Sequence, residues 1–485
     1  MRKILFLAFI ISTNVFAAFE MNENMQESYS HIINLEFTKA KDLLEIESIE
    51  NPNNGFIPLH QNYIHFLTIF IGEERNYFES NYQKKNEIIN MLEANDKSSP
   101  YYLYAQAEVH LQWAFARLKL EQYSVAAYEF VKAYKLLKKN QDDFPRFTLN
   151  KKCLGLMHSF LGAIPENFQW ILRLAGLEGG VELGLLELDE VLDDNKYKMY
   201  ESEILFLLSF FQINFTNNNI ICQKYLDRIG DRYKDNLLLN FAAARLSHNL
   251  GKNNYCINVL ESRPHSETMF HFHYLDYLQA MAYMYKLDYD NAKQSFEYFI
   301  ADFKGINYVK SAYHKLAWIA YLRGIENNYF DSVIRKGNSL IDEDKVALRD
   351  AERNYITNAS LLVSRLLYDG GYYKDALLEL LSFKVIDKNS MYFDEYWYRS
   401  AKIKLKLDYN YNEVIHDFEK SYQFGENTAN YYAPMSALTI GLIYEKLEDN
   451  IKAESYFQKC LLISDFDYQR GIHQKAKASL NRVSD

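Results

Sequence analysis

The chain has 485 residues, of which 48% are hydrophobic and 24% are charged, and its formal net charge is -10 at pH 7. An acidic chain without a cluster of lysine and arginine is a poor candidate for binding nucleic acid, because the phosphate backbone requires arrays of basic side chains. Only 7 prolines and 18 glycines are present, and the prolines fall between stretches of periodic hydrophobicity. This distribution predicts an all-α fold.

Residues 1–17 have the pattern of a cleaved secretory signal. A basic start precedes an apolar run, and the segment ends in Val15-Phe16-Ala17, which is of the small-x-small kind. The apolar run from Ile4 to Ile11 is much shorter than the roughly 20 residues that a membrane-spanning helix needs. No cysteine follows the cleavage site, so no lipid attachment is expected. We therefore expect an exported protein, periplasmic or secreted after cleavage near Ala17, without stable insertion in a membrane.

Hydrophobic residues then recur at helical spacing in pairs of segments, which predicts antiparallel helix pairs. The stretch from Tyr102 to Lys139 is the first clear match to the tetratricopeptide repeat (TPR). In this repeat a small residue on the first helix packs against an alanine twelve positions later, followed by an aromatic residue four positions on and a small residue three beyond that. Ala114, Ala126, Phe130 and Ala133 occupy these positions.

Similar spacing recurs in the second half of the chain and predicts a TPR α-solenoid. The matching positions are Ala244 with Cys256 and Leu260, Ala280 with Ala292 and Phe296, Ala317 with Tyr321, Ser364 with Ala376 and Leu380, Val414 with Phe418, and Gly441 with Ala453, Phe457 and Cys460. Where adjacent copies can be compared, the small positions lie 36 to 39 residues apart, against about 34 in the ideal repeat. We therefore expect an irregular solenoid, in which the second helix of the third copy runs from Tyr329 to Leu340.

A glycine-rich segment interrupts the helix pairs and is expected to form a compact helical hub. Gly155, Gly162 and Gly184 are among its six glycines, and glycine allows two helix backbones to approach closely. Pro165 is tolerated only near a helix start, so we expect two packed helices and a third after Gly180. The predicted organisation is a signal peptide (1–17), an N-terminal TPR-like block (18–149), the Gly-rich hub (150–192) and a C-terminal TPR solenoid ending in a polar capping helix (193–485).

The hub also resembles the signature of one TPR family. The matching runs are Gly155-Leu156, Leu161-Gly162-Ala163-Ile164-Pro165, Ile171-Leu172-Arg173-Leu174-Ala175-Gly176-Leu177, and Gly184-Leu185 before Leu188. They are similar to the inclusion-body-clearance family of eukaryotes (Iml type, with the animal tetratricopeptide repeat protein thirty-nine), although Leu177 replaces an aromatic residue and Val181 a basic one. The resemblance implies a helical-repeat scaffold with no catalytic residues to carry over.

An excess of tyrosine, 40 residues in all, suggests a binding surface. The candidate partner-binding residues lie on the side of two neighbouring helices that a TPR turns toward its concave groove: Tyr274, Tyr277, Met281, Met284, Tyr285, His314, Trp318 and Tyr321. Aromatic side chains supply large contact area at low entropy cost and are enriched at binding hot spots. The alternative is that these rings pack against a neighbouring helix.

No catalytic, cofactor-binding or metal-binding residue is assigned. The sequence contains no GxSxG, HExxH or CxxC motif. His265, His271 and His273 lie close together, but residues two apart point to different sides of a helix, so ordinary, partly buried histidines are expected. The acidic residues from Glu187 to Asp194 are expected to form a solvated helix end rather than a cation site.

The four cysteines, Cys153, Cys222, Cys256 and Cys460, lack metal-ligand spacing. Cys256 and Cys460 stand where the repeat requires small buried side chains, so free, buried thiols are expected. A Cys222–Cys256 disulfide is the alternative in an oxidising compartment.

These features predict an exported, non-enzymatic TPR scaffold that binds a protein or peptide partner through a concave aromatic groove. Two alternatives stay open. A glycan- or nutrient-binding protein of the starch-utilisation D type is also helical, TPR-based and rich in aromatic residues, although that family is usually lipidated. An enzyme with an inconspicuous site is the other alternative.

Overall fold

The computed structural model describes residues 19–163, 176–177, 179–216, 218–383 and 390–484. Every regular element within these ranges is helical, which confirms the predicted all-α class. No described helix is both long and apolar enough to cross a bilayer. The expected signal peptide lies outside the described residues, and so do residues 164–175, which contain most of the second helix expected in the hub.

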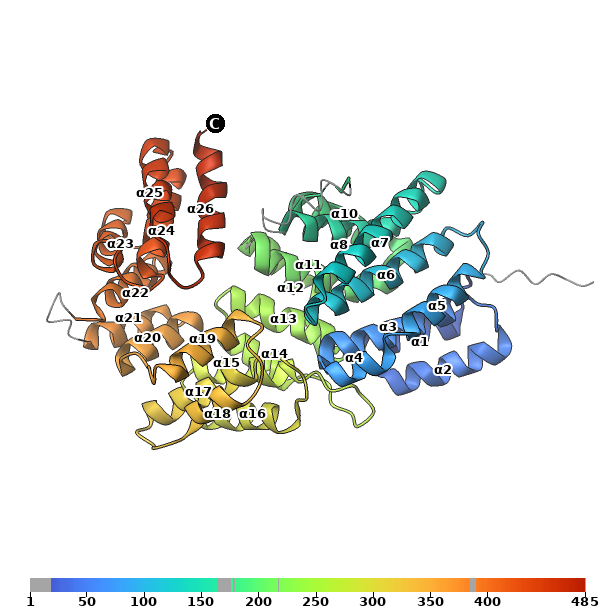
Figure 1. Ribbon diagram of the computed structural model, residues 1–485, viewed down its shortest axis with the longest axis horizontal. Coiled ribbons are helices and arrows are strands. Elements are labelled where there is room, and N and C mark those ends of the chain that lie inside the picture. The colour runs from blue at the N-terminus through green and yellow to red at the C-terminus, as the bar shows by residue number, and fades with distance from the viewer. Residues whose placement is uncertain (1–18, 164–175, 178, 217, 384–389, 485) are drawn as a thin grey trace, which may run out of the picture.

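The N-terminal block lies on the right of Figure 1. Its helices are α1 (Glu23–Ile33), α2 (Phe37–Glu50), α3 (Phe56–Gly72), α4 (Arg75–Asn81), α5 (Lys84–Glu93), α6 (Tyr101–Lys119) and α7 (Tyr123–Asp143). Helices α4 and α5 are two short helices in place of one longer helix. The Asn81 side chain donates a hydrogen bond to the Tyr77 carbonyl oxygen at 2.9 Å, and such local side-chain bonds compete with helix continuation.

Two helices of the hub cross at their glycines. These helices are α8 (Asn150–Ala163) and α10 (Val181–Asp193). A Cβ atom added to Gly184 would lie 2.3 Å from the Gly155 carbonyl oxygen, and one added to Gly162 would lie 2.5 Å from the Val181 nitrogen. The expected close approach of backbones at Gly155, Gly162 and Gly184 is thereby confirmed, whereas the division of the chain into domains stays a prediction.

The remaining helices continue below and to the left in Figure 1, and the last five stand at the upper left. They are η2 (Asn195–Tyr200), α11 (Glu201–Phe211), η3 (Gln212–Thr216), α12 (Asn219–Ile229), η4 (Gly230–Lys234), α13 (Leu237–Asn249), α14 (Asn253–Glu261), α15 (Tyr274–Tyr285), α16 (Tyr289–Asp302), α17 (Val309–Leu322), α18 (Tyr329–Arg335), α19 (Asp342–Glu352), α20 (Ala359–Asp369), α21 (Tyr373–Ser382), α22 (Phe393–Lys406), α23 (Tyr411–Gly425), α24 (Tyr432–Lys446), α25 (Asn450–Leu462) and α26 (Gln469–Ser484). Consecutive helices pack as pairs, and α26 covers α24 and α25.

One turn geometry joins the two helices of each repeat. A residue with left-handed backbone, φ between 57° and 82°, occurs in the turn at Glu121, Gly251, Leu287, Gly324, Gly371, Asp408 and Glu448. In each turn the N–H group of the next residue donates to the carbonyl oxygen five residues earlier, at 2.9 to 3.0 Å, which is the Schellman motif that ends many helices. From Gly251 onward these residues lie 36, 37, 47, 37 and 40 positions apart. The recurring turn defines the repeat independently of side chains.

The long interval of 47 residues contains an additional helix, α19. The helix expected from Tyr329 to Leu340 ends at Arg335 as α18, and Gly337 follows with a left-handed φ of 72°. Helix α19 packs against α17 and α18. Its Asp344 carboxylate accepts hydrogen bonds from the Tyr308 and Ser311 N–H groups at 2.7 and 2.8 Å. The additional helix therefore caps the start of α17.

Distant segments of the solenoid also touch. The α13–α14 turn packs on the α20–α21 turn, where a Cβ atom on Gly371 would lie 2.1 Å from the Gly251 carbonyl oxygen. At the other edge, the Phe270 N–H group donates to the Leu35 carbonyl oxygen at 2.8 Å, which ties the α14–α15 loop to the N-terminal block. These contacts close the array into a tight superhelical turn.

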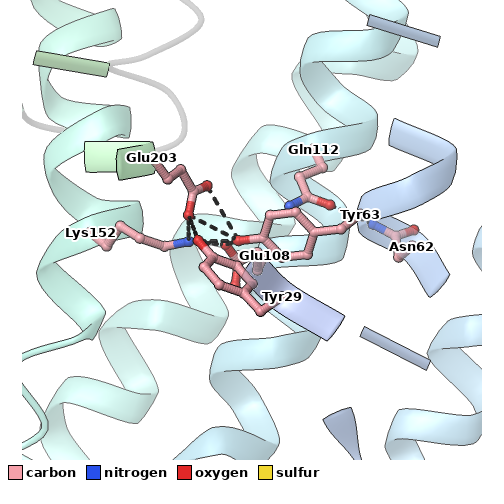
Figure 2. Close-up of polar contacts among 7 residues, drawn as sticks. All are labelled: Tyr29, Asn62, Tyr63, Glu108, Gln112, Lys152 and Glu203. Carbon is pink, nitrogen blue, oxygen red and sulfur yellow. Dashed lines mark hydrogen bonds and ion pairs between the residues drawn. The ribbon is translucent and has the colours of Figure 1, made fainter. Parts of the chain in front are cut away.

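A buried ionic network holds the N-terminal half together (Figure 2). Lys152 of α8, whose side chain is 2% exposed, lies 2.8 Å from Glu203 of α11 and 2.6 Å from the Tyr63 hydroxyl of α3. The ammonium group also contacts Glu108 of α6, and the Tyr29 hydroxyl donates to Glu203 at 2.5 Å. Burial alone would lower the pKa of Lys152, but Glu108 and Glu203 outweigh burial and raise it above its usual value. The network links five helices.

All four cysteines are buried and free, as expected, so no Cys222–Cys256 disulfide is formed. The acidic residues of α10 are not simply solvated, because several have polar partners. Glu187 lies 2.6 Å from His158, Asp189 accepts from the Tyr225 hydroxyl at 3.0 Å, and Asp193 lies 2.6 Å from Arg228. These contacts fasten α10 to its neighbours.

Candidate binding pocket

A cavity of about 210 Å³ lies among the first helices of consecutive repeats. Its walls come from α13, α15, α17 and α20, with contributions from α19 and from Tyr468 just before α26. Glu343 and Val346 of the additional helix α19 also line the cavity. The pocket is thus lined by several helices between α13 and α20.

Five of the eight predicted binding residues line this cavity: Tyr274, Tyr277, Met281, Tyr285 and Trp318. Met284 is fully buried in the hydrophobic core with Phe296, and it does not line the cavity. His314 is also buried, and its ring lies 4.8 Å from that of Trp318. Tyr321 is 41% exposed and lies outside the pocket. The structure therefore brings together five of the eight residues.

Some of the tyrosines that line the cavity also pack against neighbouring side chains. The Tyr274 and Tyr277 rings lie 4.5 and 4.9 Å from the Tyr308 ring, and the Tyr277 hydroxyl is 2.8 Å from the Ser311 hydroxyl. Tyr285 is less buried and stacks on His248 at 5.1 Å. Tyr277 is accordingly part of the wall and the core, whereas Tyr285 is the more accessible ring.

Three cationic side chains of the pocket were not predicted from the sequence: Arg245, Lys315 and Arg365. A signal for two of them was available. Arg245 follows the small residue Ala244, and Arg365 follows Ser364, just as Met281 and Trp318 follow Ala280 and Ala317. The position after each small residue of the first helix faces the pocket, because its neighbour is turned toward the second helix.

The cations are only partly neutralised by nearby acids. The Lys315 ammonium lies 3.6 Å from the Trp318 ring centroid, and Arg365 pairs with Asp369 at 3.7 Å. In the described part of the chain, no carboxylate oxygen lies within 4.0 Å of the Lys315 or Arg245 side-chain nitrogens. Burial, reinforced by Arg365, lowers the pKa of Lys315 to about 7. An anionic group entering the pocket would relieve this excess of positive charge.

Helix pairs joined by one recurring turn, with a pocket on their inner side, define a TPR-type α-solenoid. Residues 148–365 match the family model described as Iml2/Tetratricopeptide repeat protein 39. The match confirms the resemblance proposed from the hub and extends it into α20, so that it includes the pocket helices α13, α15 and α17.

The chain is also similar to solved structures, but this similarity is weak. One is a chain of the crystal structure of the APC/C hetero-tetramer Cut9-Hcn1, with 12% identity, a TM-score of 0.24, and coverage of 95% of this chain and 96% of that chain. Another is yeast Tom70, with 12% identity, a TM-score of 0.23, and coverage of 84% and 94%. TM-scores this low do not establish a common fold. The fold is therefore assigned from the helix pairs and from the family match. A search of curated proteins found no match.

Proposed function

We propose that the protein is a non-enzymatic scaffold that binds a short segment of a partner protein in the α13–α20 pocket. The observation that carries this proposal is the combination of accessible aromatic side chains with the cations Arg245 and Lys315. Glu343 and Asp369 line the same cavity, but in the described part of the chain neither cation has a carboxylate oxygen within 4.0 Å. Charge complementarity gives specificity at such sites. The segment bound should therefore present an acidic group beside an apolar or aromatic side chain.

The size of the cavity favours part of a polypeptide over a free metabolite. Pockets for whole small molecules usually measure about 300–1,000 Å³, and this cavity measures about 210 Å³. It suits one or two side chains of a segment whose remainder lies on the solenoid surface. Anchoring of this kind is typical of peptide recognition, in which a few buried side chains contribute most of the affinity.

We further propose that binding takes place after export. The support is the N-terminal pattern of a basic start, an apolar run and a small-residue ending in residues 1–17. The partner would then be a periplasmic or secreted protein.

Selection of peptides from a random library by purified protein, residues 18–485, tests the proposal. We expect selected peptides to be enriched in acidic residues next to apolar or aromatic ones. Lys315→Met and Tyr285→Ser should each weaken the selected peptides at least tenfold, the effect of losing a moderate hot spot. Tyr321→Ser is the matched control, because this tyrosine is exposed on α17 outside the pocket. Equal affinity for the wild type and both pocket variants would refute the proposal.

A further inference from the structure

Two histidines and an aspartate converge outside the pocket, where the α14–α15 loop enters α15 and where α16 ends. The rings of His271 and His273 are stacked, with centroids 4.0 Å apart and planes 19° apart. The expectation that these two side chains diverge is wrong, because they precede α15 instead of lying on a helix. Asp302, the last residue of α16, faces both rings.

The three side chains present one donor atom each to a common point. Asp302 Oδ2 lies 4.0 Å from His271 Nδ1 and 3.9 Å from His273 Nε2. One ligand atom from each residue lies within 4.8 Å of the other two. These separations exceed hydrogen-bonding distance, so the nitrogen atoms and the carboxylate do not satisfy one another directly.

A second carboxylate fixes the orientation of His271. The Nε2 atom of this ring is 2.8 Å from Asp276 Oδ2, and Asp276 is 1% exposed and also paired with Arg263. When Nε2 carries the proton that binds Asp276, Nδ1 presents a lone pair toward Asp302. A carboxylate behind a histidine is the usual outer-shell arrangement of metal-binding imidazoles.

The two ring nitrogens of His273 have different surroundings. Its Nδ1 atom is buried and has no hydrogen-bond partner among the described residues, whereas its Nε2 atom faces Asp302. The ring is held by packing, with the Phe303 ring 5.5 Å away. Nε2 is therefore the ring nitrogen of His273 that is directed toward Asp302.

We propose that His271 Nδ1, His273 Nε2 and Asp302 Oδ2 bind a zinc-like divalent ion. Tetrahedral zinc with bonds of about 2.0–2.1 Å holds its ligand atoms roughly 3.3 Å apart. The two sides of the observed triangle that meet at Asp302, 4.0 and 3.9 Å long, must therefore contract by less than about 1 Å, and the third side is at most 4.8 Å long. Two imidazoles and one carboxylate suit zinc and similar first-row ions, whereas magnesium and calcium prefer oxygen ligands. A fourth position stays open to water or to a partner residue.

Such an ion would fasten the α14–α15 loop to the end of α16. The same loop contacts the N-terminal block through Phe270, whose ring lies 5.3 Å from that of Phe37 and whose N–H group donates to Leu35. Metal binding would thereby fix the junction between the N-terminal block and the later repeats. This site is separate from the pocket and does not depend on the function proposed for it.

Titration of metal-free protein, residues 18–485, with zinc sulfate in a calorimeter tests the assignment. We expect one zinc ion to bind, Asp302→Asn to weaken binding at least tenfold, and the double variant His271→Ala with Asp302→Asn to lose the site. Cobalt should give the visible absorption of a tetrahedral complex in the wild type only, and excess magnesium should not compete. The double variant His416→Ala with Glu297→Gln removes an exposed histidine and an exposed carboxylate elsewhere, and it should bind zinc like the wild type.

The change in Tm on adding zinc tests the site even if a variant is less stable than the wild type. Zinc should raise the Tm of the wild type and of the control variant, because an ion that binds only the folded state stabilises it. It should leave the Tm of the double variant at residues 271 and 302 unchanged. Equal zinc affinity and an equal Tm shift in the wild type and that variant would overturn the proposal.

Discussion

Replacing Gly184 with alanine tests the close crossing of α8 and α10. The added Cβ would lie 2.2 Å from Ser159 Oγ, 2.3 Å from the Gly155 carbonyl oxygen and 2.4 Å from the Ser159 nitrogen. Two of these atoms belong to the backbone and cannot rotate away. Since ordinary contacts between such atoms are about 3.5 Å, the helices must separate by roughly 1 Å.

The separation should be costly because the crossing is otherwise well packed. Leu154 on α8 and Leu188 on α10 are both fully buried, and moving the helices apart weakens their contacts. Overpacking a core usually costs about 1–3 kcal/mol. We expect Gly184→Ala to lie at or above the upper end of this range, since backbone atoms are involved.

Urea titration followed by circular dichroism measures the effect. Gly471→Ala on α26 is the matched control, because nothing lies within 4 Å of the added methyl group. That change should stabilise the protein by about 0.5–1 kcal/mol, since alanine is the better helix former. A free energy of unfolding for Gly184→Ala within 1 kcal/mol of the wild type would refute the close crossing.

Four further predictions concern the core, the ionic network, the pocket and the N-terminus. Ala453→Leu should destabilise the protein by about 1–3 kcal/mol in urea, because Ala453 is fully buried at the α24–α25 crossing, whereas Ala453→Ser should be tolerated better; equal stability of the leucine variant and wild type would contradict this. Lys152→Met should cost about 3–5 kcal/mol, because it leaves Glu108 and Glu203 without their cation, whereas Lys151→Met, which removes only an exposed pair with Glu190, should change stability by less than about 1 kcal/mol. Lys315→Met should stabilise the protein at pH 6: the pKa of Lys315 is about 7 in the folded protein and 10.5 as its usual value, so the unfolded wild type binds more protons between these values and wild-type stability rises there by up to about 1.4 kcal/mol per pH unit. The advantage of the variant should therefore shrink between pH 7 and 9, and an advantage independent of pH would contradict the perturbed pKa. Finally, mass spectrometry of the exported protein should find Ala18 at the N-terminus, and a retained leader would contradict the signal assignment.

The helix pairs were predictable because their signals are local. Ala453 and Phe457 are four residues apart on one helix, and both are fully buried as the repeat pattern requires. The close crossing of α8 and α10 was predictable for a related reason, because Gly155 and Gly184 allow two helix backbones to approach closely. These patterns follow from the period of the helix and the size of one side chain.

The candidate site was only partly predictable, because it depends on how the repeats stack. Spacing identified Tyr285 and Trp318, but it also selected Met284 and His314, which are buried against the second helices of their own repeats. Arg365 reaches the same cavity as Arg245 because the α13–α14 and α20–α21 turns meet at Gly251 and Gly371. Such a contact between residues more than a hundred positions apart leaves no periodic signal.

The convergence of His271 and His273 was missed for a different reason. Both were expected on a helix, where residues two apart diverge. Helix α15 instead begins at Tyr274, and a shift of a few residues in a helix boundary is enough to change which side chains meet.

The proposed function depends on the binding of an acidic group of a partner segment beside Lys315. A double-mutant cycle tests it most directly, by combining Lys315→Met with replacement of the acidic residue of a selected peptide by its amide. Close charge pairs at interfaces show coupling energies of about 1.5 kcal/mol or more, and we predict a value of at least this size from calorimetric affinities at pH 6. A coupling energy near zero, with the peptide still bound, would contradict the account.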